Sequence, residues 1–339
     1  NNFIIILVIL LNLKDLYTIM EKILNGWIYP KNLKKTSYHD GEFKLDFPKE
    51  NLKNMIRGEC ENHDGIIWVR NCALISKKSK FWFKEDQCRV TDLDILADNL
   101  DALTSECVLM SSYGARPVPS SVKDETVEKI LNCPYITKWF TQNYDGTLIH
   151  PKLFPYPIGF PAVPLWWVGK NQNSTIEKML EMRKLSEDKK ELKIFCDVHL
   201  LARPGVGKER VVVNNEIAKQ PACDHVEVLR NRTPNMNMVY ELYSKYQFVI
   251  CTHGLGLDCH RTWEIFMVGG IIITKHSAMD YLYDDLPVIY VDNWCEVFNK
   301  DNLETWRNQV IHLTTEENIL PKMKRRYWIE EKEYNFNKN

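Results

Sequence analysis

Residues 252–264, THGLGLDCHRTWE, gather small, acidic and basic side chains directly after a run typical of a buried strand, QFVICT at 247–252. In a parallel sheet, ligands bind at the loops that follow the strands. Gly254 and Gly256 allow a tight turn or the close approach of a ligand to the backbone. Asp258 is a suitable N-cap for a helix, and the bare N–H groups of a helix N-terminus favour phosphate.

The helix expected next places three polar side chains on one face. Arg261 and Glu264 are three residues apart, and His260 and Glu264 are four apart. The opposite face is apolar and contains Trp263, Phe266 and Met267. This pattern predicts two cationic or hydrogen-bonding groups beside a phosphate site, with a carboxylate one turn further along. A nucleotide diphosphate with its ribose fits that order, and the alternative is a glycine turn followed by a surface ion pair between Arg261 and Glu264.

RPGVGKE, at 203–209, resembles a second phosphate motif, the P-loop. The motif requires glycine where Ala202 stands, and serine or threonine where Glu209 stands. The segment therefore does not satisfy the motif.

Two clusters could suggest a metal ion. The first comprises Cys251, His253, Cys259 and His260. It lacks a second ligand pair at the spacing of a zinc finger, and a buried thiol beside helix-end histidines explains it more simply. The second, Asp92-Leu93-Asp94, resembles a metal-binding DxD motif, but two exposed acids on a helix are the simpler interpretation. We expect neither a metal ion nor another cofactor.

The composition gives no electrostatic basis for binding nucleic acid or an anionic membrane. The 339 residues include 44 Lys plus Arg and 45 Asp plus Glu, for a formal net charge of −1, and 45% are hydrophobic. The one basic run, at 322–326, is interpreted as a solvated helix face.

The cysteines favour a reducing compartment and therefore a cytoplasmic location. Ten are scattered along the chain without a CxxC pair. Three that lie in apolar, strand-like runs are expected to be buried free thiols: Cys107, Cys196 and Cys251. Formal glycosylation acceptors at Asn173 and Asn231 keep the Golgi or ER lumen as the alternative.

The N-terminal segment, residues 1–35, contains the apolar run FIIILVILL at 3–11. A membrane-spanning helix needs roughly 20 apolar residues, so this run is too short as it stands. Because the chain does not begin with Met, either a signal or anchor is cut from it, or it extends upstream of a protein that starts at Met20. Any membrane attachment would have to involve this segment.

Short apolar runs alternate with helical patterns along the second half. The runs are LKIFCDVHL (192–200), DHVEVLR (224–230), QFVICT (247–252), GGIIITKH (269–276) and PVIYVDN (287–293). Strands that alternate with helices of about a dozen residues predict a parallel, doubly wound sheet with right-handed crossovers.

The first half shows a looser version of the same pattern. Its strand-like runs lie at 65–75, 106–112, 135–143 and 153–159. A segment rich in Pro, Asn and turn residues separates the halves near 165–185. The predicted parts are the N-terminal segment 1–35, an α/β domain at 36–170, a Rossmann-like domain at 171–310 and a helical tail at 311–339.

The block at 253–294, HGLGLDCHRTWE through DLPVIYVDNW, resembles the signature of exostosin-like glycosyltransferases of plants, algae and large DNA viruses. There it reads roughly RGNGLDCHRTWE, then GCIPIV, a short acidic helix and LPV. Upstream, DGIIWV, ITKWFTQNYD, HPKLFPYPIG and IFCDVHLLARPGVGKER follow the order of that family's segments, so the resemblance covers most of residues 60–298. It implies a GT-B fold, in which two Rossmann-like domains face a cleft. Residues 36–170 would then bind the acceptor, and 171–310 the nucleotide-sugar donor.

The resemblance also implies a donor site. The donor-binding set would be Arg203, Lys208, Arg210, His253, Gly254, Gly256, Asp258, His260, Arg261 and Glu264. The two glycines would approach the diphosphate, His260 and Arg261 would neutralise it, and Glu264 would hold the ribose hydroxyls. Because GT-B enzymes stabilise the departing diphosphate with side chains and a helix dipole, no divalent metal is implied.

The acceptor hydroxyl needs a base within hydrogen-bond reach, supplied from the first half. Asp145 and His150 are the catalytic candidates, because they follow the strand-like run at 135–143. Asn143 and Lys152 are candidates for binding acceptor hydroxyls. The alternative is a turn aspartate and a loop histidine without catalytic roles.

Two positions depart from the family pattern. Ile272 stands where the family usually has Pro, and Ala115 lies in a stretch that normally carries an Asp near that position. Ala115 cannot act as an acid, a base or an anchor, which bears on acceptor handling and on activity.

The leading hypothesis is transfer of a sugar from a nucleotide-sugar donor, a UDP-sugar, to a hydroxyl of a glycan or glycoprotein acceptor. One alternative is a GT-A transferase that uses Asp92 and Asp94 with manganese. Another is a catalytically silent nucleotide- or glycan-binding protein, which the alanine at 115 would suit.

Overall fold

The computed structural model describes residues 49–71, 90–112, 116–160, 172–186, 189–198, 208–220, 223–229, 236–254 and 256–332. The N-terminal segment 1–35, Ala115 and Arg203 lie outside the described residues, as does the side chain of Lys208.

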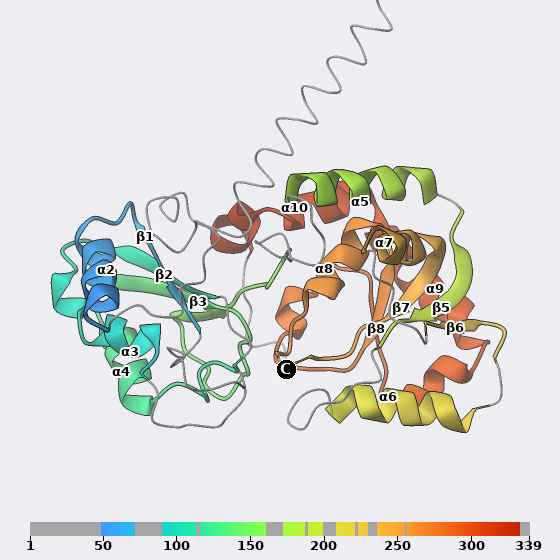
Figure 1. The fold of residues 1–339 in the computed structure, drawn as a ribbon, viewed down its shortest axis with the longest axis horizontal. Helices are drawn as coiled ribbons and strands as arrows, with labels where there is room; N and C mark the ends of the chain where they lie inside the picture. The colour runs from blue at the N-terminus through green and yellow to red at the C-terminus, as the bar shows by residue number, and fades with distance from the viewer. Residues whose placement is uncertain are drawn as a thin grey trace, which may run out of the picture.

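The chain has an α/β fold with two parallel sheets, as the sequence predicts (Figure 1). The first sheet has the order β1-β2-β3-β4, with β1 (Ile66–Arg70), β2 (Cys107–Ser112), β3 (Ile136–Thr141) and β4 (Leu153–Pro155). The second has the order β6-β5-β7-β8-β9, with β5 (Glu191–Cys196), β6 (Val226–Val228), β7 (Tyr246–Ile250), β8 (Ile271–Thr274) and β9 (Val288–Tyr290). Each predicted strand-like run corresponds to one of these strands.

The strand order of the second sheet reverses between β5 and β7. From β5 the chain first adds β6 on one side, and then β7, β8 and β9 in turn on the other side. Such a reversal leaves a crevice outside the carboxyl ends of the two central strands, which is where ligands bind in open α/β sheets. The described strands of the first sheet follow chain order without a reversal.

Helices cover both faces of the second sheet because its strands are apolar on both sides. Its helices are α5 (Gln172–Ser186), α6 (Lys208–Lys219), α7 (Met236–Lys245), α8 (His260–Met267) and α9 (Asn302–Val310). Along β7, Phe248 and Ile250 pack with α6 and α9, whereas Val249 between them packs with α7 and α8. The two-residue period of a strand therefore produces the doubly wound arrangement.

Helices α2 (Lys49–Glu61), α3 (Asp92–Ala97) and α4 (Asp124–Asn132), with the 3₁₀ turn η2 (Leu100–Ala102), accompany the first sheet. Helix α3 packs against both α2 and α4, as Figure 1 shows. None of the helices in the described part of the chain is long and apolar enough to cross a membrane.

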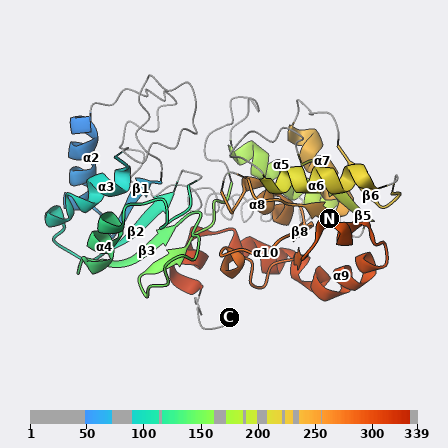
Figure 2. The same cartoon turned by 90° about the horizontal axis from the view of Figure 1, so that it is seen from below.

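The C-terminal tail connects the two sheets. After η4 (Trp294–Phe298) and α9, it forms η5 (Ile311–Thr314), α10 (Glu316–Lys322) and the π-helical turn η6 (Tyr327–Glu331). Figures 1 and 2 show the end of this tail, in red, beside the first sheet. Lys322 belongs to the basic run predicted to be a solvated helix face, but it is 7% exposed and its ammonium group donates to Asn318. That interpretation is wrong for Lys322, because α10 packs inward.

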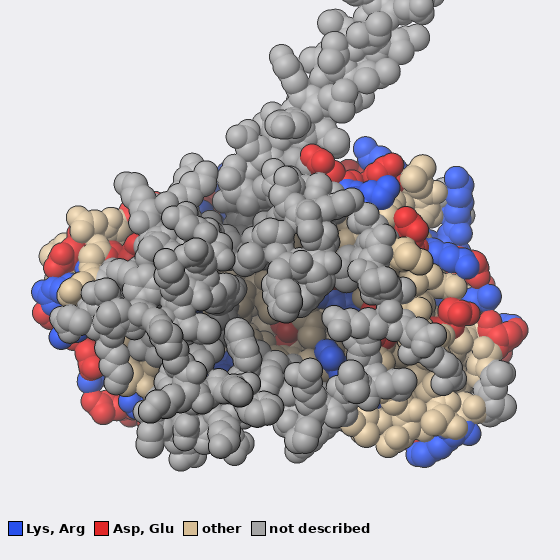
Figure 3. Space-filling model, in the orientation of Figure 1, with Lys and Arg blue, Asp and Glu red and all other residues tan. Residues whose placement is uncertain are grey.

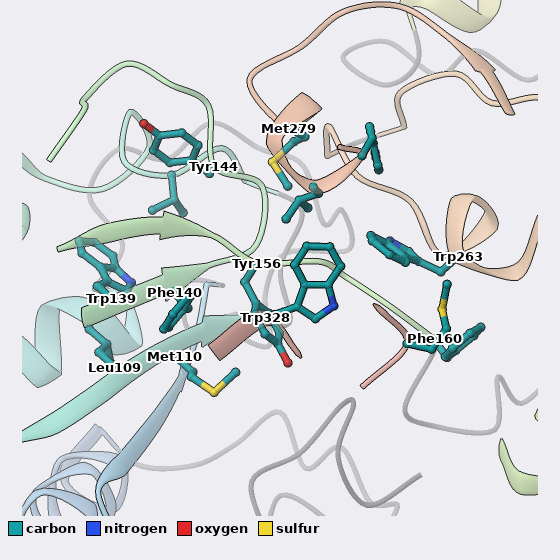
Figure 4. Close-up of a cluster of buried hydrophobic side chains, with 14 of the residues drawn as sticks. Leu109, Met110, Trp139, Phe140, Tyr144, Tyr156, Phe160, Trp263, Met279 and Trp328 are labelled. Carbon is teal, nitrogen blue, oxygen red and sulfur yellow. The ribbon is translucent and has the colours of Figure 1, made fainter. Parts of the chain in front are cut away.

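One continuous apolar cluster contains residues of both sheets and of the tail. Figure 4 shows Phe140 and Tyr156 from the first half around Trp328 of the tail, with Trp263 and Met279 from the second half. The rings of Trp263 and Trp328 meet edge to face, with their centroids 5.7 Å apart. The shared core therefore holds the two sheets in one arrangement.

The eight cysteines that the structure describes are free thiols, as predicted. Those in the strands are buried, and burial raises the pKa of Cys107 to about 11 and that of Cys196 to about 12. A raised pKa keeps these thiols protonated and unreactive near neutral pH.

We predict that Trp328→Ala lowers the free energy of unfolding by about 3 to 5 kcal/mol, because a fully buried indole is removed and leaves a cavity. Trp328 is 1% exposed, and its indole N–H donates to the carbonyl of Lys322 (2.8 Å). Urea unfolding measures the change, with exposed Glu330→Gln in the same turn as the control. A loss within about 0.5 kcal/mol, the range for surface substitutions, would show that the tail does not stabilise the junction.

Candidate functional site

The reversal between β5 and β7 brings together residues from the loops after these two strands and from helices α6 and α8. Asp197 follows β5, the loop from Cys251 to Gly254 follows β7, and Arg261 lies in the first turn of α8. Arg210 lies in the first turn of α6, and a Cβ at Gly254 would come within 3.2 Å of its guanidinium group. The side chain of Arg210 therefore lies close to the backbone of this turn.

Arg261 forms an ion pair with Asp197, which the sequence analysis did not name. Its Nε lies 3.3 Å from Asp197 Oδ1 and donates to the hydroxyl of Tyr243 (3.1 Å), which in turn donates to Asp197 Oδ2 (2.7 Å). Burial lowers the pKa of Arg261, but Asp197 and its other neighbours outweigh burial and give a net upward shift. The guanidinium group is therefore a permanent cation held by the fold.

Glu264 does not pair with Arg261 in the surface ion pair that the sequence left open. It is 5% exposed, and its Oε1 accepts a hydrogen bond from the hydroxyl of Tyr240 (3.1 Å). Burial raises the pKa of Glu264 to about 7, although the bond from Tyr240 and the charge of Arg261 act in the opposite direction. The carboxyl group is thus close to half-protonated at neutral pH and can exchange hydrogen bonds with hydroxyls.

Three buried polar atoms at this point have no hydrogen-bond partner among the described residues. They are Asp197 Oδ1, Arg210 Nε and Thr252 Oγ1. The Asp197 oxygen still lies near Arg261, but their alignment does not satisfy a hydrogen bond. Because buried polar atoms in proteins are nearly always hydrogen-bonded, three unsatisfied atoms at one sheet edge indicate a place for a polar ligand.

Gly254 and Gly256 have different roles. The N–H of Gly254 donates to the carbonyl of Gly256 (3.0 Å), which closes the predicted tight turn. A Cβ at Gly256 would overlap the side chain of Asn143 in the first domain. Asn143 is fully buried with a φ of 55°, at the end of β3. Gly256 is therefore required by the contact between domains and not by a ligand alone.

Asp258 is not the N-cap of α8, contrary to the prediction, because Cys259 occupies that position. The Asp258 carboxylate accepts hydrogen bonds from the backbone N–H groups of Ile158 (2.7 Å) and Cys259 (2.8 Å). It also accepts from the side chains of Trp263 (2.9 Å) and Tyr283 (3.0 Å). Burial raises its pKa to about 6 against these bonds. Both carboxylate oxygens are engaged in hydrogen bonds within the protein, and these bonds connect Asp258 in the second domain to Ile158 at the end of the first.

His260 is bound to the first domain. Its Nδ1 lies 2.6 Å from the carbonyl oxygen of Gly159 and must carry the proton, because a carbonyl only accepts. Burial lowers the pKa of His260, so the ring is neutral near pH 7. Of the two residues predicted to neutralise a diphosphate, Arg261 is therefore the one that is charged near pH 7, and the role of His260 in binding the donor stays a prediction.

His253 is held through Glu209, at the start of α6. The backbone N–H of His253 donates to the Glu209 carboxylate (2.9 Å), and the ring Nδ1 lies 3.7 Å from the same oxygen. Glu209, which stands where a P-loop requires serine or threonine, therefore fixes the loop after β7 against α6.

Asp145 and Lys152, two of the acceptor-side candidates, form hydrogen bonds with other residues of the first domain. The carboxylate of Asp145 accepts from Ser120 N–H (3.1 Å) and from both the N–H and hydroxyl of Thr147. The ammonium group of Lys152 donates to the carbonyl of Cys133 (2.8 Å). This geometry matches the turn interpretation of Asp145.

The third candidate, His150, accepts a hydrogen bond at Nδ1 from the backbone N–H of Lys152 (3.1 Å). Burial lowers the pKa of His150. A neutral ring with Nδ1 as acceptor carries its proton on Nε2, which then cannot take up another proton. Of the acceptor-side set, Asn143 is the residue placed against the second domain.

The DxD motif has no free carboxylate for a metal ion. Asp92 and Asp94 are 3% and 7% exposed, so the interpretation as exposed acids is wrong. Asp92 accepts two bonds from Arg70 (2.7 and 3.0 Å), and Asp94 caps α3 through Thr91 and accepts from Thr126 (2.6 Å). These partners occupy the ligands that a GT-A site would need, and the described residues contain no cluster suited to a metal ion.

The sequence analysis missed Asp197, Tyr240, Tyr243 and Thr252. Asp197 and Thr252 follow strand ends, so the rule that ligands bind at strand ends could have identified them. The two tyrosines had no such signal, because their three-residue spacing in α7 is typical of an ordinary core-facing stripe.

No family model and no curated protein matches this chain. Among solved structures, HepE from Anabaena in complex with UDP and glucose is similar, with a TM-score of 0.40 and 10% identity over 80% of this chain and 77% of that chain. A UDP-forming α,α-trehalose-phosphate synthase from Burkholderia xenovorans has a TM-score of 0.40 and 11% identity over 82% and 74%. An E. coli trehalose-6-phosphate structure bound with UDP-2-fluoro glucose has a TM-score of 0.38 and 9% identity over 91% and 83%. Likenesses this distant carry no argument about the chemistry of this chain.

We predict that Glu264→Gln changes the pH dependence of stability. The folded-state pKa of Glu264, about 7, lies above its unfolded value, so its contribution to stability is complete below about pH 4.5 and is lost as the pH rises through 7. The unfolding free energy of the wild type, relative to the variant, should therefore fall by on the order of 1 to 3 kcal/mol between pH 4.5 and 8.

Urea unfolding at pH 4.5, 6 and 8 measures this difference. Met238→Leu, at an exposed and uncharged position on α7, serves as the control whose difference from the wild type should not change with pH. A constant difference for Glu264→Gln as well would contradict the raised pKa.

Proposed function

We propose that this chain is a glycosyltransferase that moves a sugar from a UDP-sugar to a hydroxyl of a glycan or glycoprotein, with the donor bound at the reversal between β5 and β7. The observation that carries the proposal is the set of unsatisfied buried atoms on Asp197, Arg210 and Thr252 at that reversal. The resemblance of residues 253–294 to exostosin-like transferases supports the same site.

In this proposal the diphosphate lies between the N-terminal turns of α6 and α8. Arg210 supplies a guanidinium group beside the Gly254 turn, and Arg261 supplies the second positive charge. Transfer leaves extra negative charge on the departing diphosphate, and fixed cations with helix N–H groups stabilise that charge without reorganising. No divalent metal is required for this step.

Glu264 holds the ribose in this proposal. It lies one helical turn beyond His260, about 5.4 Å further along α8. A fully ionised carboxylate would repel a neighbouring diphosphate, and a pKa of about 7 reduces that repulsion. Tyr240 fixes one oxygen and leaves the carboxyl group oriented for a ligand hydroxyl.

A silent nucleotide-binding protein is the second candidate function. The observation that favours it is that Asp145 and His150 are both engaged within the first domain, which leaves the acceptor without a base from the predicted pair. Binding of the nucleotide without release of UDP would identify this case.

The proposed function is tested by thermal unfolding with UDP, UDP-glucose, UDP-galactose and UDP-xylose, each with and without EDTA. A donor at 100 times its dissociation constant should stabilise the fold by about 2.7 kcal/mol. We expect the stabilisation and the release of UDP from the best donor to persist in EDTA. Loss of both on chelation, with recovery in manganese, would contradict the metal-free site, and no stabilisation by any probe would contradict the function.

We predict that two variants separate the phosphate and ribose parts of the site. Arg210→Gln should weaken binding of UDP and of inorganic pyrophosphate alike by about 10- to 100-fold, because a charge-assisted bond contributes about 1.5 to 3 kcal/mol. Glu264→Gln should weaken UDP binding and leave pyrophosphate binding nearly unchanged.

Isothermal titration calorimetry with both ligands measures these affinities. Lys219→Gln, at the opposite end of α6, is the matched control because its side chain is 65% exposed and pairs only with Glu216 among the contacts of the described chain. An equal loss of both ligands in Glu264→Gln would rule out the ribose role, and unchanged binding in Arg210→Gln would rule out the phosphate role.

A further inference from the structure

The proposed transfer needs a proton acceptor, and the side chains expected to supply it are engaged elsewhere. Asp145 is bound within its own turn, and His150 carries its proton on the outer nitrogen. The remaining requirement is a group at the domain junction with an accessible lone pair and a neighbour that stabilises the protonated form.

His276 has this chemistry. It lies two residues beyond β8, and its Nδ1 is 2.6 Å from Oδ2 of Asp280 in η3 (Asp280–Leu282). The other oxygen of Asp280 accepts from the N–H of Ser277 (2.9 Å). A carboxylate only accepts, so Nδ1 carries the ring proton and Nε2 retains its lone pair.

Tyr290, in β9, fixes the imidazole from a second side. The rings of His276 and Tyr290 stack with centroids 4.0 Å apart and an interplanar angle of 9°. Burial raises the pKa of Tyr290, and the nearby charges of Asp280 and Asp284 raise it further, so its hydroxyl stays protonated. His276 is 67% exposed at its side chain and yet is held by a stacked ring and a carboxylate. An exposed side chain that is oriented in this way presents one reactive edge, Nε2, to the outside.

The loop that carries His276 faces the first domain. A Cβ at Gly146 would lie 3.0 Å from Cβ of Ala278, two residues after His276. The loop after the neighbouring strand β7 carries Gly256, where an added Cβ would overlap the side chain of Asn143 at the same junction. The turn at 143–146 therefore meets the carboxyl edge of the second sheet at both β7 and β8.

The charges around His276 suit a proton acceptor. Asp280 is the carboxylate bonded to the ring, and Asp284 adds a second negative charge beside Tyr290. Lys275, the adjacent cation on the same loop, donates to the carbonyl of Asp292 (2.7 Å) and is thereby directed to the end of β9. Asp280 is therefore the carboxylate in direct contact with the ring.

We propose that His276, oriented by Asp280 and Tyr290, is the base that takes the proton of the acceptor hydroxyl. This inference rests on the proposed function. The acceptor oxygen forms a bond to the anomeric carbon of the donor sugar and gives its proton to Nε2. The bond from that carbon to the diphosphate oxygen breaks, and UDP leaves with the electron pair. The imidazolium then returns its proton to water.

The experiment measures UDP release from the UDP-sugar that most stabilises the wild type, with water as the acceptor, together with the affinity for UDP by calorimetry. His276→Gln should lower the release rate by about 100-fold or more, the usual contribution of a general base, while the affinity for UDP stays within about twofold. His312→Gln, which removes an exposed histidine in η5, is the control and should change neither quantity.

Two further variants test the chemistry itself. Added imidazole should raise the rate of UDP release by His276→Ala by about tenfold or more, because it supplies the missing base. Asp280→Asn can donate to Nδ1 and shift the ring proton to Nε2, so it should also lower the rate while UDP still binds.

The outcomes separate the inference from the proposed function. Failure of the wild type to bind UDP or any UDP-sugar would overturn the proposed function and this inference with it. If UDP binds and His276→Gln releases UDP from the UDP-sugar at the wild-type rate, the contact between His276 and Asp280 has no catalytic role. The inference alone is then overturned. It is equally overturned if the wild type binds but releases no UDP, or if His276→Gln loses affinity for UDP.

Discussion

The buried carboxylate of Asp258 is the interaction on which the rest of this arrangement depends. It accepts bonds from four donors in three parts of the chain: Ile158 before the second domain, Cys259 and Trp263 at the N-cap and within α8, and Tyr283 after η3. Burying a carboxylate is unfavourable unless donors surround it, which is why its pKa is raised although each of these bonds lowers it. A single group of this kind fixes the loop, the helix and the end of the first domain together.

The positions of the neighbouring polar residues follow from this constraint. Once Asp258 is tied to Ile158, His260 reaches the carbonyl of Gly159, and Gly256 lies against Asn143. The carboxyl edges of both sheets then meet at one junction, and in Figure 3 the surface near the middle of the molecule is hollowed, with charged side chains of both signs visible there. Among the residues of this face that are not drawn in grey, Lys and Arg side chains are interspersed with Asp and Glu side chains.

The sequence was sufficient to predict both sheets and the loop that follows β7, but not the hydrogen-bond partners of the polar residues in and around that loop. Strands and loops follow from local periodicity, which is why each apolar run proved to be a strand and the loop after β7 lies at the sheet reversal. Hydrogen-bond partners come from distant parts of the chain. Asp258 has the local pattern of an N-cap, yet Ile158, a hundred residues earlier, competes for its oxygen. Asp92 has the pattern of an exposed acid until Arg70 is brought beside it by the pairing of β1.

The electrostatics of α8 resolve a difficulty in placing a carboxyl group near a proposed diphosphate. Three polar residues share the first turns of this helix, and each has a different charge state: His260 is neutral, Arg261 is a cation, and Glu264 is close to half-protonated near neutral pH. Asp197 offsets the charge of Arg261, so the buried cation is not left uncompensated. A dianionic ligand would add negative charge beside the same guanidinium group and raise the proton affinity of Glu264 further. The proton that Glu264 binds for part of the time lowers its average negative charge, which reduces the repulsion that a fully ionised glutamate would impose on the diphosphate.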